Sequence, residues 1–342
     1  MTEQETYDRP RDTAPPAAPL PSEPYYQGPP ARRGRVGLGL ALVVVGVLLL
    51  AAQLLGGVGF GGGGSYTLVD EQLAGRRLEL SVIASDVEVR AWDGDQIRVE
   101  AIQHGGSRGD LKVDVEQSGD TVRVTEAAGS MFCLFCSRSV TYRVDVPASV
   151  AAEIKTTSGN IEVTGLSGAV SLSSTSGDVR AEELTSGLIV NTASGDVVLS
   201  DIAGKLQVDT ISGDVQLSDG RVEPASVNTT SGGVELEGVV GALQVGTVSG
   251  DITVHDAGAI TLNLSSTSGE IDYAGGLAAG ASSVSTISGD INLRLPEESA
   301  FKLEASSVSG EISDAFNTAD AGASDTTLSA SSTSGDIEIE GR

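Results

Sequence analysis

The amino-acid sequence predicts an all-β protein: a single-stranded parallel β-solenoid with coils of ~18–20 residues, preceded by one transmembrane α-helix. Three observations predict this fold. A Ser-Gly-Asp tripeptide recurs at nearly constant spacing, apolar residues alternate between its recurrences, and one uncharged apolar run lies near the N-terminus. Aromatic residues make up only 4% of the chain, which suits narrow stacked coils better than a core filled with bulky rings.

The N-terminal segments predict where the protein resides. Residues 1–35 hold eight of the eleven prolines and are expected to form a disordered cytoplasmic arm. Residues 36–60 carry no charge and can cross a hydrocarbon core of ~30 Å as a helix. Because arginines precede this run and none follows it closely, the positive-inside rule places the rest of the chain outside a bacterial cell membrane. A cleaved signal peptide is the alternative, although its apolar region is usually shorter; residues 61–65 then form a Gly-rich tether.

The tripeptide Ser-Gly-Asp, or a near variant, marks each coil of the predicted solenoid in residues 151–342. The intervals between its serines are 18, 18, 18, 19, 18, 19, 20, 21 and 25 residues, at Ser158, Ser176, Ser194, Ser212, Ser231, Ser249, Ser268, Ser288, Ser309 and Ser334. Between markers, apolar residues alternate in two short runs, such as Val197 and Leu199 followed by Leu206 and Val208. A period of two indicates a strand with one buried face. An antiparallel sandwich is the rival fold, but it would not require the same residue at the same phase of every repeat.

Residues 66–150 are less regular and are predicted to form an N-terminal capping β region. The apolar residues between Val87 and Val99 follow the offsets of the repeats and indicate a degenerate first coil. The alternating runs Leu111–Val115 and Thr121–Thr125 predict a hairpin. At the other end, the outward glutamates of Ile337–Glu340 are expected to discourage edge-to-edge pairing.

These motifs resemble a known family. The sequence Tyr-Arg-Val-Asp-Val-Pro at 142–147, then Lys-Thr-Thr-Ser-Gly-Asn-Ile-Glu-Val at 155–163 and tandem Ser-Gly-Asp coils, resembles a largely uncharacterised bacterial family of β-strand-repeat proteins labelled "putative adhesins". The resemblance covers about residues 66–342. It implies a cell-surface solenoid connected with adhesion or envelope-stress responses, and it supplies no catalytic residue.

The acidic residue after Ser-Gly would form a line along one edge of the stacked coils. This line consists of Asp178, Asp196, Asp214, Asp251, Glu270, Asp290, Glu311 and Asp336, with Asn160 and Gly233 as exceptions. Carboxylates ~5 Å apart repel by only about 0.8 kcal/mol in water, and oxygen ligands attract divalent cations such as Ca²⁺. The alternative is that Asp is simply a turn residue that hydrogen-bonds nearby backbone amides. No cofactor other than this candidate cation is expected.

Two cysteines lie in the capping region. Zinc would need two further ligands for Cys133 and Cys136, and a thioredoxin-like role would need a βαβ setting, so the sequence predicts a local disulfide outside the membrane. Four apolar residues around this pair form either a contact patch for a partner or membrane surface or a cap on the solenoid: Met131, Phe132, Leu134 and Phe135.

The net charge of −26 argues against nucleic acid as a partner. The sequence predicts a non-enzymatic surface protein for adhesion or envelope scaffolding, with envelope glycan, a lipid surface or a membrane protein as its partner. One alternative is an envelope-stress sensor that works with another membrane protein. A polysaccharide-acting β-helix enzyme is another, but it would need an irregular cluster of acidic and basic groups that these uniform repeats lack.

Overall fold

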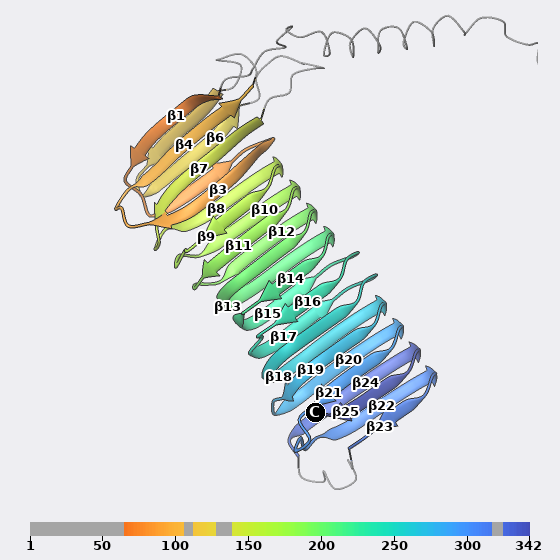
Figure 1. Ribbon diagram of the computed structural model, residues 1–342. Helices are drawn as coiled ribbons and strands as arrows, with labels where there is room; N and C mark the ends of the chain where they lie inside the picture. The colour runs from red at the N-terminus through yellow and green to blue at the C-terminus, as the bar shows by residue number, and fades with distance from the viewer. Residues whose placement is uncertain (1–64, 106–111, 128–138, 317–323) are drawn as a thin grey trace, which may run out of the picture. The chain divides into compact units, whose positions relative to one another are not determined.

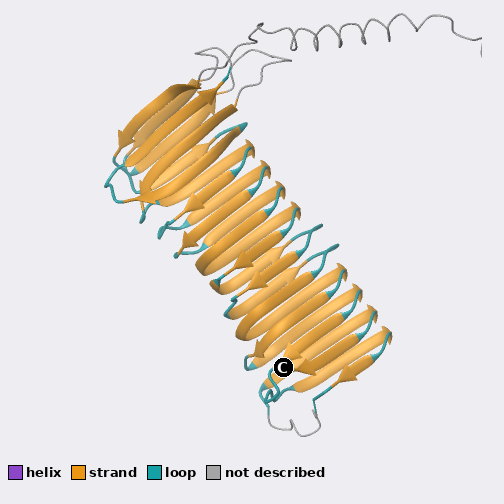
Figure 2. Cartoon of the chain, viewed as in Figure 1, coloured by secondary structure: helices purple, strands orange, loops and turns teal. Residues whose placement is uncertain are grey.

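The computed structural model describes residues 65–105, 112–127, 139–316 and 324–342. These residues form β-strands joined by turns (Figures 1 and 2). The predicted arm and transmembrane helix, residues 1–35 and 36–60, lie outside the described residues. Within the described ranges, no helix has the length and apolar character needed to span a membrane. Residues Gly62–Arg342 form a compact unit of their own, and only this unit is described below.

Each coil contributes one strand to each of two sheets, and β13 and β18 bend from one sheet into the other. The first sheet has the spatial order β5 (Lys112–Ser118), β6 (Thr121–Ala127), β2 (Arg77–Ser81), β8 (Ala151–Ser158), β10 (Val170–Ser176), β12 (Leu188–Ser194), the second half of β13 (Val197–Ser212), β15 (Arg221–Asn228), β17 (Gly241–Gly246), the second half of β18 (Ile252–Ser268), β20 (Gly280–Ser288), β24 (Thr326–Ser334) and β22 (Lys302–Ser309).

The second sheet lies across the interior from the first. Its spatial order is β1 (Ser65–Leu73), β4 (Ile97–His104), β7 (Ser139–Pro147), β3 (Ser85–Trp92), β9 (Ile161–Thr164), β11 (Val179–Leu184), the first half of β13, β14 (Val215–Ser218), β16 (Val234–Glu237), the first half of β18, β19 (Ile271–Leu277), β21 (Ile291–Leu295), β25 (Ile337–Gly341) and β23 (Ile312–Asp314).

Equivalent residues of successive coils stack on one another. Leu172 pairs with Val190 and Val190 with Val208, all in parallel register and all fully buried. Alternate residues face inward and fill the space between the sheets with Val, Leu and Ile, as the period of two predicts. The all-β solenoid fold is therefore confirmed.

The glycine of the Ser-Gly-Asp marker is required by the stacking. Gly195 has a φ of 136°, and a Cβ atom at this position would lie 2.2 Å from the carbonyl oxygen of Gly177 in the neighbouring coil. Both the backbone conformation and the close approach favour glycine. The marker recurs because each coil turns the same corner against the backbone of the coil beside it.

The coils follow chain order through the middle of the solenoid but not at its ends. The coil of β2 and β3 lies between β6–β7 and β8–β9, and the coil of β24 and β25 lies between β20–β21 and β22–β23 (Figure 1). The prediction that Ile337–Glu340 ends the solenoid as an edge is therefore wrong, because β25 pairs on both sides. The longer final marker intervals leave enough chain for the last coil to step back over its predecessor.

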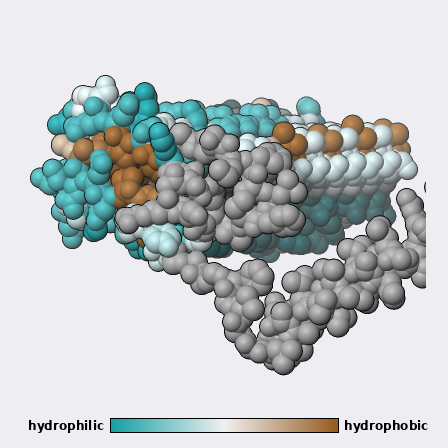
Figure 3. Space-filling view, turned by 90° about the horizontal axis from the view of Figure 1, so that it is seen from above, coloured by the Kyte–Doolittle hydropathy of each residue, from teal (hydrophilic) through white to brown (hydrophobic). Residues whose placement is uncertain are grey.

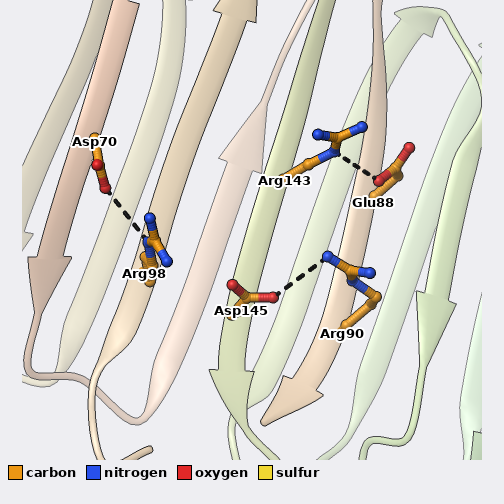
Figure 4. A network of polar contacts seen from close by, with 6 residues as sticks. All are labelled: Asp70, Glu88, Arg90, Arg98, Arg143 and Asp145. Atoms are coloured by element: carbon orange, nitrogen blue, oxygen red, sulfur yellow. Dashed lines mark hydrogen bonds and ion pairs between the residues drawn. The ribbon is translucent and has the colours of Figure 1, made fainter. Parts of the chain in front are cut away.

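Antiparallel strands close the N-terminal end. The β5–β6 hairpin is confirmed, and β4 runs antiparallel to both β7 and β1. The prediction of a degenerate first coil is correct for β3, which pairs in parallel with β9, and wrong for the residues from Ile97 onward, which form β4. Cross-strand ion pairs link these strands at 3.4, 3.1 and 3.8 Å (Figure 4), namely Arg98–Asp70, Arg143–Glu88 and Arg90–Asp145.

Candidate functional site

The acidic residues of the Ser-Gly-Asp markers form a ladder along the corner where the chain passes from the first sheet to the second. One carboxylate oxygen of each Asp accepts a hydrogen bond from the backbone N–H of the equivalent residue in the next coil. The Asp178 carboxylate accepts from the Asp196 N–H at 3.0 Å, and the Asp196 carboxylate accepts from the Asp214 N–H at 3.0 Å. Asn160 takes the same place with its amide oxygen, 3.0 Å from the Asp178 nitrogen.

The ladder runs in the spatial order of the coils. Near the C-terminal end, the Asp290 carboxylate accepts from the Asp336 N–H at 2.8 Å, and the Asp336 carboxylate accepts from the Glu311 N–H at 2.7 Å. At the N-terminal end, Asp86 accepts from the Asn160 N–H at 2.9 Å. Sequence reasoning left Asp86 out of the ladder, although the tripeptide Ala-Ser-Asp at 84–86 stands in for the marker.

These contacts favour the structural role of Asp over cation binding. Each Asp side chain completes the backbone pairing between coils, so one of its oxygens is already used. Among the described residues, no three Asp, Glu, His or Cys side chains are grouped so that they could hold a metal ion together. The Ca²⁺ ladder stays a prediction, and what the structure shows at these positions is inter-coil hydrogen bonding.

Gly233 interrupts this ladder and leaves a notch. Because Gly233 has no side chain, the Asp214 carboxylate lies beside an open space of about 420 Å³, which Glu235 and Asp251 also line. The Gly233 N–H still donates to Asp214, at 2.8 Å. Three carboxylates line the notch, so its lining is acidic.

A larger acidic groove lies at the opposite corner, where the chain returns from the second sheet to the first. It encloses about 580 Å³ across several coils. Five exposed carboxylates and the guanidinium of Arg221 line it, the carboxylates being those of Glu183, Asp201, Asp219, Glu237 and Asp256. We call these five carboxylates and Arg221 the acidic groove.

Four of the five carboxylate residues have left-handed backbone conformations. The φ angles of Glu183, Asp201, Asp219 and Asp256 are 56°, 51°, 52° and 47°. Residues other than glycine adopt this region at a cost, and Asp tolerates it better than Glu. In the coil between Asp219 and Asp256 the position is Gly238, with a φ of 77°. The groove therefore repeats a strained corner that places a carboxylate in solvent at nearly every turn.

The acidic groove was missed by sequence reasoning, although a signal for it existed. Four of its five carboxylates follow the marker acid by five residues, as Glu183 follows Asp178 and Asp201 follows Asp196. Glu237 departs from this spacing. The side chains that line the groove carry a net negative charge, because five carboxylates outnumber the one lining arginine, Arg221. Asp256 also lies 3.9 Å from the guanidinium of Arg342.

A column of exposed side chains runs beside the Ser-Gly corner, formed by the residue before each marker serine. Its apolar members are 48–83% exposed, at Ile211, Val248, Ile287 and Val308. In space they alternate with threonines, because the coil containing Thr333 lies between those of Ile287 and Val308. Figure 3 shows this alternation along one edge of the molecule. The alternation keeps the apolar side chains two coils, or ~10 Å, apart, so they form no continuous apolar stripe.

The predicted disulfide and contact patch are not placed by the structure. Cys133 and Cys136 lie outside the described residues, as do the four apolar residues Met131, Phe132, Leu134 and Phe135. Both remain predictions.

Comparison with known proteins gives a family match. The sequence model of the family described as Toastrack DUF4097 matches residues 76–340. A putative cell adhesion protein of Clostridium sporogenes is 11% identical over 82% of this chain and 100% of that chain, with a TM-score of 0.26. A putative lipid binding protein of Parabacteroides distasonis is 12% identical over 82% of this chain and 96% of that chain, with a TM-score of 0.32. None of the curated proteins compared with the chain matches it.

Proposed function

This chain belongs to the Toastrack DUF4097 family, and we propose that it is a membrane-anchored, non-catalytic surface protein that binds a positively charged partner along its acidic groove. The observation that carries this proposal is the groove itself, which combines five exposed carboxylates with a strained backbone at four of them. Strained residues cluster at functional sites more often than elsewhere. A partner rich in Lys or Arg would complement the charge of the groove.

The uniformity of the coils supports binding rather than catalysis. A hydrolytic site on a solenoid needs two carboxylates held in different environments, so that one is protonated while the other is ionised. The carboxylates of the acidic groove are instead all exposed to solvent and occupy equivalent corners of successive coils. Such an array suits the recognition of an extended, repetitive ligand, because the same chemical group recurs at each coil.

The proposed anchor is the apolar run at residues 36–60, with the solenoid on the outer side of a bacterial membrane. The strands begin at Ser65, so only a few residues would separate the membrane from the first sheet strand. The envelope is where such a protein would meet cationic peptides, glycans and lipid headgroups.

The test measures binding of purified residues 62–342 to cationic peptides, envelope glycan and anionic lipid vesicles, each with and without Ca²⁺. We expect the cationic peptides to bind, and the double variant Asp201→Asn/Asp219→Asn to weaken this binding by about tenfold, because two of five carboxylates are lost. Asn tolerates the left-handed conformation, so the backbone of the groove should be kept.

The matched control is Asp178→Asn/Asp196→Asn on the opposite corner. It removes the same two charges, and the amide oxygen of Asn can accept the inter-coil hydrogen bond, as Asn160 already does. Equal weakening by both double variants would show a general effect of net charge and would contradict the groove as the site. Binding only in the presence of Ca²⁺, lost in the control variant, would instead assign the site to the Asp ladder.

A further inference from the structure

A second groove crosses the outer face of the first sheet, where β15, β17, β18 and β20 lie side by side (Figure 1). It encloses about 340 Å³. Five exposed residues line it, and we call them the neutral groove: Pro224, Ala242, Gln244, Asn263 and Ala281. The half-buried hydroxyl residues Ser226 and Thr261 also contribute to the lining.

The lining of the neutral groove carries no charge. This is unusual in a chain with a net charge of −26. Carboxylates line the acidic groove and the notch beside Gly233, and Arg77 and Glu153 line a smaller groove near the N-terminal end. The neutral groove is therefore unsuited to a cationic or an anionic ligand, because neither would find a compensating charge there.

The pairing of the strands is irregular on both sides of the neutral groove. On one side, Glu223 and Pro224 of β15 stand opposite the single residue Lys205 of β13, which makes a bulge. On the other side, the Leu262 N–H donates to the hydroxyl of Ser282 at 3.2 Å. Bulges re-aim the side chains around them and are enriched beside binding sites.

Two side-chain amides stand in the neutral groove with their hydrogen-bonding groups unused. Gln244 and Asn263 pair in parallel register on β17 and β18, and both are exposed. Among the described residues, neither side-chain amide has a hydrogen-bond partner. Each of them offers two N–H donors and one carbonyl acceptor.

Matching amides on the second sheet are engaged within the molecule. The Asn292 amide donates to the Glu270 carboxylate at 2.6 Å, and the Gln216 amide donates to the Glu235 carboxylate at 3.3 Å. The amides of the neutral groove lack such carboxylate partners because the residues around them are uncharged. Their donors and acceptors therefore face solvent and are available to a ligand.

The chemistry of the lining selects the class of ligand. A peptide that adds a strand needs an unpaired strand edge, and β17 pairs on both sides, with β15 and β18. A lipid chain needs a continuous apolar surface, which the two amides interrupt. A sugar ring has hydroxyl groups at its edge and C–H groups on its faces, so it can use the amides together with the apolar side chains of Pro224 and Ala242.

We propose that the neutral groove binds an uncharged polysaccharide, whose hydroxyl groups exchange hydrogen bonds with the amides of Gln244 and Asn263. Successive coils are ~4.8 Å apart, which is close to the length of one pyranose unit in a chain. A polysaccharide that follows the stacking direction would therefore present one sugar to each coil. Ser226 and Ser283 extend the same column by one coil on either side.

This inference goes beyond the proposed function and does not depend on it. The neutral groove and the acidic groove share no lining residue. A neutral ligand also predicts binding that changes little with salt concentration, whereas salt should weaken the binding of a cationic peptide to the acidic groove.

The experiment measures how far neutral polysaccharides slow the full chain in native gels, in a detergent without a sugar headgroup. The probes are an α-glucan, a β-glucan and a galactomannan, each dissolved in the gel and compared with a gel without it. We expect at least one probe to slow the wild type. Gln244→Ala/Asn263→Ala should raise the dissociation constant by about tenfold or more, because two side chains that bond hydroxyls are lost. Ala242→Leu keeps both amides but fills the groove, and it should weaken binding as well.

The matched control is Gln216→Ala/Asn292→Ala, which removes one Gln and one Asn amide from the outer face of the second sheet and should leave binding unchanged. Asp201→Asn/Asp219→Asn in the acidic groove should also leave it unchanged, which separates this inference from the proposed function. Thermal unfolding of every variant checks that it is folded.

A wild-type chain that none of the three probes slows would overturn the proposal. So would equal weakening by the control variant, or a folded Gln244→Ala/Asn263→Ala chain that binds like the wild type. Displacement of the polysaccharide by a Lys-rich peptide, together with loss of binding in Asp201→Asn/Asp219→Asn, would assign the binding to the acidic groove instead.

Discussion

The two ends of the solenoid solve the same physical problem in different ways. At the N-terminal end, antiparallel strands cover the outermost coil, and the inward-facing residues of β4, including Val99, are fully buried. At the C-terminal end, the described residues give the last coil a neighbour on one side only, and its inward-facing Leu303 is half-buried. Apart from Arg342–Asp256, the ion pairs of the described residues lie between Asp70 and Lys155.

This difference shows how a repeated fold can end. A stack of identical coils has no intrinsic stop, because each coil offers the next the same edge. The N-terminal end stops by changing strand direction, whereas the C-terminal end stops only because the chain has stepped back into the stack. Among the described residues, each end has two strands that pair on one side only, β1 and β5 at the N-terminal end and β22 and β23 at the C-terminal end. The ends therefore differ in strand direction and in whether further strands cover the outermost coil.

The largest expected effect on stability comes from a substitution in β4, which covers the outermost coil at the N-terminal end. Val99→Asp places an unpaired charge in a fully buried position and should lower the free energy of unfolding by about 4 kcal/mol or more. Leu303→Asp makes the same kind of change at the open end, where water reaches the side chain, and should cost only about 1–2 kcal/mol. Urea unfolding at low protein concentration measures both.

Val99→Ala is the control for the loss of volume alone, since it removes methyl groups without adding charge, and its cost should lie between the two. Similar costs for Val99→Asp and Leu303→Asp would mean that the two ends are equally protected. The comparison between them would then be wrong.

The sequence predicted the middle of the solenoid well because every local signal agrees there. Alternating apolar residues set the inward face, and glycine marks the corner where coils approach too closely for a Cβ atom, as at Gly195. Both signals are local, so they can be read from one repeat. The order of coils is not local. In β22 and β24, inward-facing and outward-facing residues alternate in the same way relative to the marker serine. By this pattern alone, either strand could have paired with β20.

The marker aspartates and the acidic groove differ in how far the sequence predicts them. The marker aspartates were found, but their role depends on hydrogen bonds between coils 18 or more residues apart, such as Asp178 to the Asp196 N–H. The acidic groove was missed because an exposed acid in a corner is compositionally ordinary. What singles out Asp201 is its left-handed backbone, and the residues around it give no clear sign of that conformation.

A smaller effect on stability is expected at the buried hydroxyl two residues before each marker serine. The two halves of the solenoid differ in how this hydroxyl is hydrogen-bonded. Toward the N-terminal end, these hydroxyls have no hydrogen-bond partner among the described residues, as at Thr192. Toward the C-terminal end they donate to a glycine carbonyl of the adjacent coil, as Thr286 does to Gly269 at 3.2 Å. Thr192→Val should therefore be neutral or stabilising, whereas Thr286→Val should cost about 1 kcal/mol.

Both substitutions keep the shape of the side chain, and both sites are 5–6% exposed, so differences in packing are small. Thermal unfolding of both variants and of the wild type measures the change in stability that each substitution causes. A cost at Thr192 equal to that at Thr286 would show that both hydroxyls are bonded in solution, and the two halves of the solenoid would then not differ in this respect.

The smallest expected effect concerns pH and one rung of the marker ladder. Burial, followed by the charges of Asp272, Asp290 and Asp251, raises the pKa of Glu270 above its ordinary value of 4.5, although a hydrogen bond from Asn292 opposes the shift. A carboxyl group whose pKa is raised by folding favours the folded state below its unfolded pKa. That contribution is lost as the pH rises through the folded pKa.

Glu270→Gln should therefore raise the unfolding midpoint at pH 7 slightly, and this gain should vanish below pH 4.5. Glu311 stands at the same rung position in the last coil and has an acidic ladder neighbour, Asp336, on one side only. Because fewer like charges surround it, Glu311→Gln should gain less at pH 7. Midpoints measured from pH 4 to pH 8 decide the matter: an equal gain for both variants would mean that the open end does not relieve the repulsion along the ladder.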